Sequence, residues 1–218
     1  MEPLTEKYRP KALDEVVGQP ENIETIKKLL EKRESQQIPS LLLYGGAGLG
    51  KSATAEAIAN EINAELSKFN ASSEGKKETA KEKIVPALRN AWRPKVVVIE
   101  EADGLSGHAQ MSLKEDISQN QSTKAILILI TNHIDKIVDP IKSRCMPFEY
   151  EPIETKQIKQ HLEHIAKKED LDSDLNGEIQ KIAKRADGDI RKAINQLDRE
   201  TLIDDDKTKE TAKQIFGE

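Results

Sequence analysis

The stretch GGAGLGKS at residues 45–52 constrains the fold and chemistry of this chain more than any other feature. It satisfies the pattern G-x-x-x-x-G-K-[ST], follows the apolar run Leu41–Tyr44 and leads into an alanine-rich stretch. A strand, a glycine-rich loop and a helix in this order form a phosphate loop, whose backbone N–H groups surround a phosphate. We therefore predict a nucleoside triphosphate site made by Gly45, Gly46, Ala47, Gly48, Leu49, Gly50, Lys51 and Ser52.

Lys51 and Ser52 carry the charge and the metal chemistry of this loop. The Lys51 ammonium is expected to reach the β- and γ-phosphates, and the Ser52 hydroxyl is expected to bind Mg²⁺. The alternative is a glycine-rich turn followed by an ordinary lysine. The strand expected before the loop and the helix expected after it favour the phosphate loop.

Short apolar runs alternate with helix-period segments through the first 150 residues. Runs typical of buried strands are Leu41–Tyr44, Leu66–Phe69, Lys95–Ile99, Ala125–Ile130 and Met146–Tyr150, with helical segments near 21–33, 51–62, 78–90 and 109–119. Strands separated by helices of this length imply a parallel sheet covered on both faces. After Pro152 only helical segments follow, near 155–169, 174–186, 189–203 and 207–216, and Asp189 is expected to cap the third. We predict an α/β fold with a five-stranded parallel sheet in residues 1–151, followed by a small all-α domain in residues 152–218.

The composition excludes several classes of protein. The 218 residues have a formal net charge of −5, which argues against a strongly basic nucleic-acid binder but does not exclude a local basic face. The longest apolar runs fall far short of the roughly 20 residues that a membrane-spanning helix needs, and no charged-then-apolar leader opens the sequence. The single cysteine, Cys145, rules out an internal disulfide framework and is expected to be a small buried residue. We expect no membrane partner and a cytoplasmic or nuclear location. The lone Trp92 is expected to anchor packing.

Acidic residues directly follow the apolar run Val96–Ile99. Glu100, Glu101 and Asp103 come where this predicted strand ends, and the carboxyl ends of parallel strands form the crevice where α/β sheets bind ligands. One carboxylate there can hold a metal ion through water, while its neighbour orients and polarises an attacking water. We assign Glu100, with Ser52, to the metal ion and Glu101 to catalysis. An acidic loop without such a role is the alternative.

Seven short motifs occur in one order along the chain and carry a family resemblance. They are E-K-Y-R-P at 6–10, V-V-G-Q at 16–19, the phosphate loop, E-E-A-D at 100–103, T-N at 131–132, S-R-C at 143–145 and G-D-I-R at 188–191. Together they resemble the small ATPase subunit of a replication clamp loader, of the replication factor C type, in the AAA+ superfamily. The S-R-C triplet and the E-K-Y-R-P opening are the discriminating parts. The resemblance implies ATP as the nucleotide and an AAA+ core followed by a helical lid.

The resemblance also implies roles for residues outside the phosphate loop. Val16 and Val17 would line the adenine pocket, although alone they would be interpreted as a core-packing pair. Asn132 would be the sensor-1 residue that hydrogen-bonds the γ-phosphate and the attacking water, or else an Asn in a loop turn. Arg191 would be the sensor-2 arginine that reaches the γ-phosphate from the lid, or else a surface arginine. The dipole of a helix disfavours a cation in its first turn, which hints at a role for Arg191.

Arg144, in the S-R-C triplet, would be an arginine finger that enters the ATP site of a neighbouring subunit. An arginine there stabilises charge on the transferring phosphoryl group and contributes on the order of 10³–10⁵ in rate. The active site would then be shared between chains, and an isolated chain should hydrolyse ATP slowly. The alternative is a local ion pair of Arg144 with Asp139 or Glu149.

The partners implied by the resemblance are other clamp-loader subunits, a sliding clamp and primed DNA, with the DNA held through its phosphate backbone. Asn70 resembles a family position that can hold the catalytic glutamate away from water until DNA binds. The candidate DNA-facing lysines that follow it are Lys76, Lys77, Lys81 and Lys83. A solvated helix face is an equal alternative for these lysines.

The sequence departs from the family pattern in two ways that matter for function. Glu100 stands where the pattern has aspartate, and its extra methylene calls turnover, but not ATP binding, into question. The family's C-terminal collar domain is missing after the lid, so we do not expect a stable pentamer from this chain alone. Two rival hypotheses stay open. The chain could be a non-hydrolysing ATP-binding subunit that supplies an arginine finger in trans, or an AAA+ ATPase of another branch, such as a helicase loader or junction motor.

Overall fold

The structure is a computed structural model that describes residues 2–33, 38–74, 83–89, 91–119, 124–171 and 176–201. It divides into two compact units. The core unit is Pro10–Glu151, and the helical unit combines the described parts of residues 1–9 and 152–218. Among the residues described, no helix is both long enough and apolar enough to cross a membrane.

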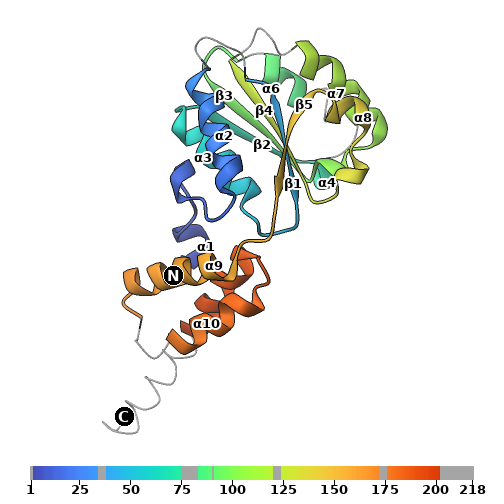
Figure 1. Ribbon diagram of the computed structural model, residues 1–218. Coiled ribbons are helices and arrows are strands. Elements are labelled where there is room, and N and C mark those ends of the chain that lie inside the picture. Colours follow the sequence, from blue (N-terminus) through green and yellow to red (C-terminus); the bar gives the residue numbers. More distant parts are fainter. Residues whose placement is uncertain are drawn as a thin grey trace, which may run out of the picture. The chain divides into compact units, whose positions relative to one another are not determined.

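A parallel sheet forms the centre of the core unit (Figure 1). Its strands are β1 (Ser40–Gly45), β2 (Glu65–Asn70), β3 (Lys95–Glu100), β4 (Ala125–Thr131) and β5 (Cys145–Tyr150), in the spatial order β2-β3-β4-β1-β5. Every pairing between neighbouring strands is parallel. Each strand overlaps the run of residues from which we predicted it, so the expected five-stranded parallel sheet is confirmed.

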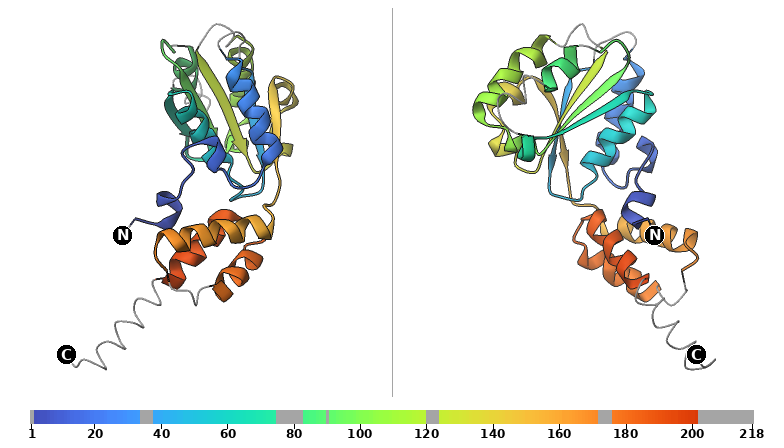
Figure 2. Two further views of the ribbon diagram at one scale, coloured as in Figure 1. Left: turned by 60° about the vertical axis from the view of Figure 1, so that its left-hand side comes forward. Right: turned by 180° about the vertical axis from the view of Figure 1, so that it is seen from behind.

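Helices cover both faces of this sheet (Figure 1, Figure 2). On one face lie α2 (Pro20–Glu31) and α3 (Lys51–Glu61), and on the other lie α6 (Val85–Arg89), α7 (Gly107–Gln119) and α8 (Asp139–Lys142). The short elements of the unit are the 3-10 turns η1 (Leu13–Glu15), η3 (Ala102–Gly104) and η5 (Ile134–Lys136), and helix α4 (Ala71–Glu74). Part of the helix that we predicted near 78–90 lies outside the described residues.

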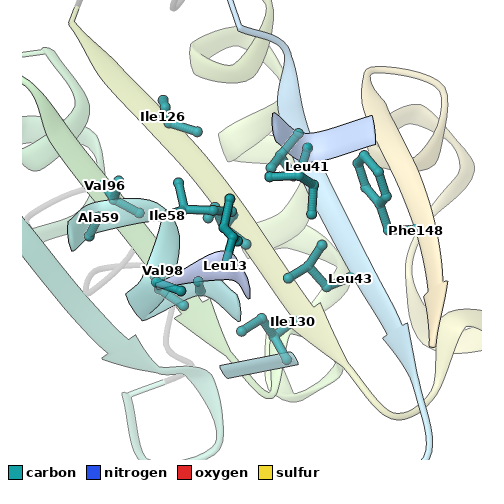
Figure 3. Packing of buried hydrophobic residues seen from close by; sticks show 14 of the residues in the cluster. Leu13, Leu41, Leu43, Ile58, Ala59, Val96, Val98, Ile126, Ile130 and Phe148 are labelled. Carbon is teal, nitrogen blue, oxygen red and sulfur yellow. The ribbon is translucent and has the colours of Figure 1, made fainter. Parts of the chain in front are cut away.

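Alternate residues of the central strands point to opposite faces of the sheet. Those that face α2 and α3 pack with Ile58 of α3 and Leu13 of η1; they are Leu41, Leu43, Val96, Val98, Ile126 and Ile130 (Figure 3). The intervening residues pack against the helices of the other face; they are Leu42, Val97, Ile99, Leu127 and Leu129. Burial on both faces explains why these strands are continuous apolar runs in the sequence. It also fixes their register, and with it the loops that leave their ends.

The helical unit packs α9 (Thr155–Lys168), α10 (Asn176–Arg185) and a helix at residues 190–201 around aliphatic side chains that include Leu162 and Leu197. The helix at 190–201 begins after Asp189, whose Oδ1 accepts a hydrogen bond from the backbone N–H of Lys192 at 2.8 Å. The predicted N-cap is therefore confirmed. The further helix that we predicted at 207–216 lies outside the described residues.

The N-terminal segment belongs to the helical unit and not to the core unit in which we placed it. Helix α1 (Leu4–Lys7) buries Leu4, whose backbone N–H donates to Asp198 Oδ2 at 3.3 Å. Lys7 forms an ion pair with Glu169 at 2.7 Å, and the Tyr8 hydroxyl donates to the same carboxylate. These partners are 161 and 162 positions apart in sequence, so no local pattern could reveal their contact.

Trp92 does not anchor packing, contrary to our expectation. Its side chain is 90% exposed on the segment between α6 and β3. The faces of the sheet are already filled by aliphatic side chains of the strands and helices, so the core has no place that needs an indole. Cys145, in contrast, is buried as predicted, and this burial raises the pKa of its thiol to about 12.

Candidate nucleotide-binding site

The ends of three strands bring most of the predicted site residues together. β4 lies between β3 and β1, so the segments that follow these three strands leave the sheet side by side, at the carboxyl ends of the strands. These segments are the phosphate loop after β1, the acidic segment after β3 and Thr131–His133 at the end of β4. This is the edge at which parallel α/β sheets bind ligands.

The phosphate loop follows a backbone path that needs glycine at two points. Gly45 has a φ of +136°, and a Cβ built on it would come within 2.2 Å of the Tyr150 carbonyl oxygen in neighbouring β5. Gly50, with a φ of +94°, occupies the left-handed region immediately before α3. Both conformations are unfavourable for residues that carry a Cβ. The loop thereby brings its backbone N–H groups and the N-terminus of α3 to one place.

Lys51 is buried at the start of α3, with 6% of its surface exposed. Its ammonium donates to the Gly45 carbonyl at 2.8 Å, to the Gly46 carbonyl, and to Asn132 Oδ1 at 2.9 Å. A buried ammonium is stable only when such acceptors replace the water that it has lost. Phosphate oxygens can take the place of these oxygens, so the arrangement fits a bound anion. It also brings together Lys51 and Asn132, both of which we predicted to contact the terminal phosphates.

Ser52 and Glu100, the residues that we assigned to the metal ion, are also in contact. The Ser52 hydroxyl donates a hydrogen bond to Glu100 Oε2 at 3.0 Å. Adjacent oxygen ligands of octahedral Mg²⁺, each about 2.1 Å from the ion, lie about 3.0 Å apart. This pair of oxygens therefore fits one Mg²⁺ ion, and the longer side chain of Glu100 reaches Ser52 without leaving the site.

Glu101 lies at the turn that follows β3. Its backbone is left-handed, with φ 51° and ψ 46°, and its carbonyl accepts a hydrogen bond from the N–H of Gly104 at 2.7 Å, which closes the turn η3. The Glu101 side chain is exposed at the edge of the sheet. Its carboxylate is therefore accessible to a water molecule, as its predicted catalytic role requires.

Val16 and Val17, the predicted adenine contacts, lie between η1 and α2 and are partly buried. Val16 Cγ1 is 3.6 Å from the position of a Cβ built on Gly50, which places Val16 against the phosphate loop. Val16 also packs against the aliphatic core. The same segment is held by Gln19, whose side-chain amide exchanges two hydrogen bonds with the backbone of Glu151. The adenine contact stays a prediction beside the core-packing role.

Arg144 lies at the amino ends of the strands, whereas the phosphate loop lies at their carboxyl ends. It precedes Cys145, which pairs with Ser40 at the start of β1, whereas the phosphate loop begins at Gly45, where β1 ends. At about 3.3 Å per residue, the two ends of β1 are about 16 Å apart. The exposed Arg144 guanidinium donates to the Pro140 carbonyl at 2.8 Å and to the Ser143 hydroxyl at 3.3 Å. It therefore lies away from the phosphate loop of its own chain.

Arg191 belongs to the helical unit. It is exposed in the first turn of the helix at 190–201, two positions after the capping residue Asp189. Its placement in that turn agrees with the prediction, and its sensor-2 role stays a prediction.

The candidate DNA-facing segment is described only in part. Asn70, at the end of β2, accepts a hydrogen bond through Oδ1 from the backbone N–H of Ser72 at 2.9 Å and so caps the start of α4. Lys83 is exposed, and Lys76, Lys77 and Lys81 lie outside the described residues. The DNA contact stays a prediction.

Sequence reasoning did not single out Gln110, a buried polar residue of α7 with 4% exposure. Its Nε2 donates to the carbonyls of Leu105 and Lys136, both at 3.1 Å, and its Oε1 accepts from the N–H of Val138 at 2.8 Å. Gln110 thus joins the segment after the acidic turn to the segment before α8. The available signal was a glutamine between Ala109 and Leu113 on an otherwise apolar helix face.

Comparison with known proteins agrees with the motifs. The family model described as ATPase family associated with various cellular activities (AAA) matches residues 41–152. The chain is similar to the replication factor C small subunit of Methanosarcina mazei, with 36% identity over 212 residues that cover 93% of this chain and 61% of that protein. It is similarly related to the replication factor C small subunit of Archaeoglobus fulgidus, with 35% identity over 219 residues that cover 96% of this chain and 67% of that protein.

A solved structure with a similar fold is RuvB of Thermotoga maritima, described as a Holliday junction branch migration motor. The TM-score is 0.74 at 26% identity, with 88% of this chain and 64% of that chain covered. This likeness agrees with a parallel sheet flanked by helices, whereas the replication factor C relatives are more similar in sequence. The matches therefore show that this chain belongs to the AAA family of ATPases and, within it, to the replication factor C small subunits.

Proposed function

We propose that the chain is the ATPase module of a DNA sliding-clamp loader and that it hydrolyses ATP at an interface between subunits. The observation that carries this proposal is the contact of Lys51 with Asn132 and of Ser52 with Glu100 at one edge of the sheet. Residues from three separate strand ends meet there in an arrangement that suits a triphosphate and one Mg²⁺ ion. Family membership supports the same conclusion.

In this proposal each group of the site has a distinct task. The Lys51 ammonium exchanges its carbonyl acceptors for β- and γ-phosphate oxygens, while Ser52 and Glu100 hold Mg²⁺. The metal ion neutralises charge that develops on the phosphates. Glu101 orients and polarises the attacking water, and Asn132 hydrogen-bonds the γ-phosphate and that water. Val16 and Val17 contact the adenine.

Arg144 acts in this proposal on the nucleotide of a neighbouring subunit. It is separated from its own phosphate loop by the length of β1, about 16 Å. An exposed guanidinium at that edge can enter the site of an adjacent chain and stabilise the transferring phosphoryl group. Arg191 reaches the γ-phosphate from the helical unit.

The proposed partners follow from the names of the relatives, which are replication factor C small subunits. They are other clamp-loader subunits, a sliding clamp and primed DNA, and they imply a location inside the cell. DNA would be held through its phosphate backbone, so binding should weaken as salt rises. Lys83 is the described member of the candidate basic segment.

A second candidate function is an ATP-binding subunit that does not hydrolyse ATP but supplies Arg144 to a neighbour. The observation that favours it is Glu100, whose longer side chain occupies the place of the expected aspartate and bonds directly to Ser52. A Glu100→Asp variant separates the two functions. Hydrolysis that appears only in this variant supports the second candidate, because it attributes the defect to the metal ligand.

The proposal is tested by mixing two defective variants. Arg144→Ala keeps an intact phosphate loop, and Lys51→Ala keeps an intact arginine finger. With a sliding clamp, partner subunits and primed DNA present, each variant alone should lose at least about 100-fold in ATP hydrolysis. The mixture should recover a measurable fraction, because Arg144 of one chain serves the nucleotide of the other.

The matched control for this test is Arg33→Ala, which removes an exposed arginine just beyond α2. We expect this variant to hydrolyse ATP at the wild-type rate. An Arg144→Ala variant as active as Arg33→Ala would refute the arginine finger. A mixture no more active than its components would refute its action in trans.

A further inference from the structure

The turn that carries Glu101 is held by tight packing on one side. A Cβ built on Gly104 would lie 2.8 Å from Ser72 Oγ and 2.9 Å from the backbone nitrogen of Ser72, so α4 is in direct contact with the turn η3. No side chain larger than hydrogen fits between them without displacement. The turn therefore cannot move toward α4.

The other side of the same turn is held by a hydrogen bond to the end of β4. The Thr131 hydroxyl donates to Asp103 Oδ1 at 2.6 Å, a distance typical of a hydroxyl bound to a carboxylate. Thr131 is buried, with 1% exposure. Its hydroxyl oxygen also accepts from the backbone N–H of His133 at 2.9 Å. The two bonds of this one hydroxyl fix the chain on both sides of Asn132.

Glu101 and Asn132, by contrast, have exposed side chains that are not packed in the core, although the Asn132 amide oxygen accepts a hydrogen bond from the Lys51 ammonium at 2.9 Å. Glu101 also has a left-handed backbone, which a residue with a Cβ adopts only when its surroundings impose it. A displacement of about 1 Å between groups that act on the same water can cost on the order of 100-fold in rate. Something other than packing must therefore set the separation of these two side chains.

We propose that Asp103 is a positioning residue for ATP hydrolysis. Through Thr131 it joins the turn of Glu101 to the turn of Asn132, so that both side chains face the terminal phosphate in a fixed relation. This inference rests on the proposed function, because it assigns Asp103 to the same site. In this inference Asp103 has no contact of its own with the nucleotide, and its effect passes through Glu101 and Asn132.

Four substitutions and one control separate this role from a merely structural one. Asp103→Ala and Thr131→Val remove the hydrogen bond, whereas Asp103→Asn and Thr131→Ser keep an acceptor and a donor. The control, Ser106→Ala, removes a nearby hydroxyl that accepts from the backbone N–H of Ala109 and has no bond to β4. All five variants are assayed in the full chain together with the proposed partners.

We expect Asp103→Ala and Thr131→Val each to lower kcat at least about 10-fold and to leave the KM for ATP within about twofold. The double variant should be no slower than the slower single variant, because both remove the same bond. Asp103→Asn and Thr131→Ser should stay within about threefold of wild type, as should Ser106→Ala. A loss of kcat in Asp103→Asn equal to that in Asp103→Ala would overturn the positioning role.

A second measurement needs no nucleotide. Hydrogen exchange of the His133 amide, followed by NMR in the chain alone, should be about 10-fold faster in Asp103→Ala and Thr131→Val than in wild type or Ser106→Ala. Unchanged exchange in Asp103→Ala would overturn the inference even if kcat fell.

The two proposals fail in different ways. If wild type hydrolyses ATP and the Asp103→Ala variant matches it, the positioning role fails and the proposed function survives. If wild type does not hydrolyse ATP with every partner present, the ATPase function fails, and the positioning role fails with it whatever the exchange data show.

Discussion

The strand ends of the core unit and the N-terminal segment of the helical unit are held by different kinds of contact. In the core unit, buried strands such as β3 and β4 fix where the site loops leave the sheet, and Lys51 is itself buried. In the helical unit, the N-terminal segment is held by polar contacts to Glu169 and Asp198 that are partly open to solvent. Buried apolar packing is worth several kcal/mol per side chain, whereas exposed ion pairs are worth about 1 kcal/mol or less.

Most of the candidate site residues lie in the core unit, next to the ends of its buried strands. Of the candidate site residues, the phosphate loop, Ser52, Glu100 and the Glu101 turn belong to the core unit, and Arg191 belongs to the helical unit. Three predictions test this contrast, beginning with the largest expected effect.

Truncation of a buried leucine should destabilise the unit that contains it and leave the other unit unchanged. Leu127 in β4 and Leu162 in α9 are both fully buried, and truncation of either to alanine should cost about 3 kcal/mol of unfolding free energy. In Leu127→Ala, hydrogen exchange should accelerate in β1 and β3, while the amides of α9 keep their protection. Leu162→Ala should show the reverse. Equal loss of protection in both units for either variant would mean that they unfold as one.

Acid should destabilise the helical unit through His161. Burial, with a smaller contribution from the charge of His164, lowers the pKa of His161 from its usual 6.5 to about 4. Between pH 4 and pH 6.5 the unfolded chain therefore binds more protons than the folded chain. Stability is therefore complete above pH 6.5 and falls as the pH drops toward 4, by up to about 3 kcal/mol.

The measurement for His161 is the exchange of α9 amides between pH 7 and pH 4.5. His161→Gln should flatten the pH dependence, whereas His164→Gln, at a neighbouring exposed histidine, should largely keep it. A pH dependence that survives in His161→Gln would contradict the assignment.

Loss of the Tyr8 hydroxyl should have the smallest of the three effects. This hydroxyl donates to Glu169, and its pKa is raised to about 12, mainly by burial and also by that carboxylate. Tyr8→Phe should lower the stability of the helical unit by about 1 kcal/mol. The matched control is Tyr44→Phe in the core unit, which removes a longer bond to Glu149 of 3.3 Å. The measurement is hydrogen exchange of the α9 amides. If Tyr44→Phe accelerated this exchange as much as Tyr8→Phe did, the bond from Tyr8 to Glu169 would have no specific role in stabilising the helical unit.

The sequence predicted the features that depend on neighbours along the chain. The phosphate loop is defined by eight consecutive residues, and the central strands β1, β3 and β4 each by one apolar run, because burial on both faces requires continuous hydrophobicity. The cap at Asp189 depends on residues three positions apart. The closeness of Ser52, Glu100 and Asn132 then follows, because the carboxyl ends of parallel strands lie on the same side of the sheet.

Features that depend on distant residues were not predictable in the same way. The pairing of Tyr8 with Glu169 spans 161 positions, and the bond from Thr131 to Asp103 spans 28. Trp92 was expected in the core because an indole is largely apolar, but its segment lies outside the packed faces of the sheet. Gln110 forms bonds with three backbone groups that only the folded chain assembles.

The most direct test of the account is the binding of Mg·ATP to this chain, measured by titration calorimetry in wild type and in Lys51→Ala. We expect one ATP per wild-type chain and an affinity at least about 100-fold lower in the variant, because the proposal assigns the buried Lys51 ammonium to the β- and γ-phosphates. Lys28→Ala, which removes an exposed lysine paired with Glu24, should bind like wild type. Undiminished ATP binding in Lys51→Ala would contradict the central claim.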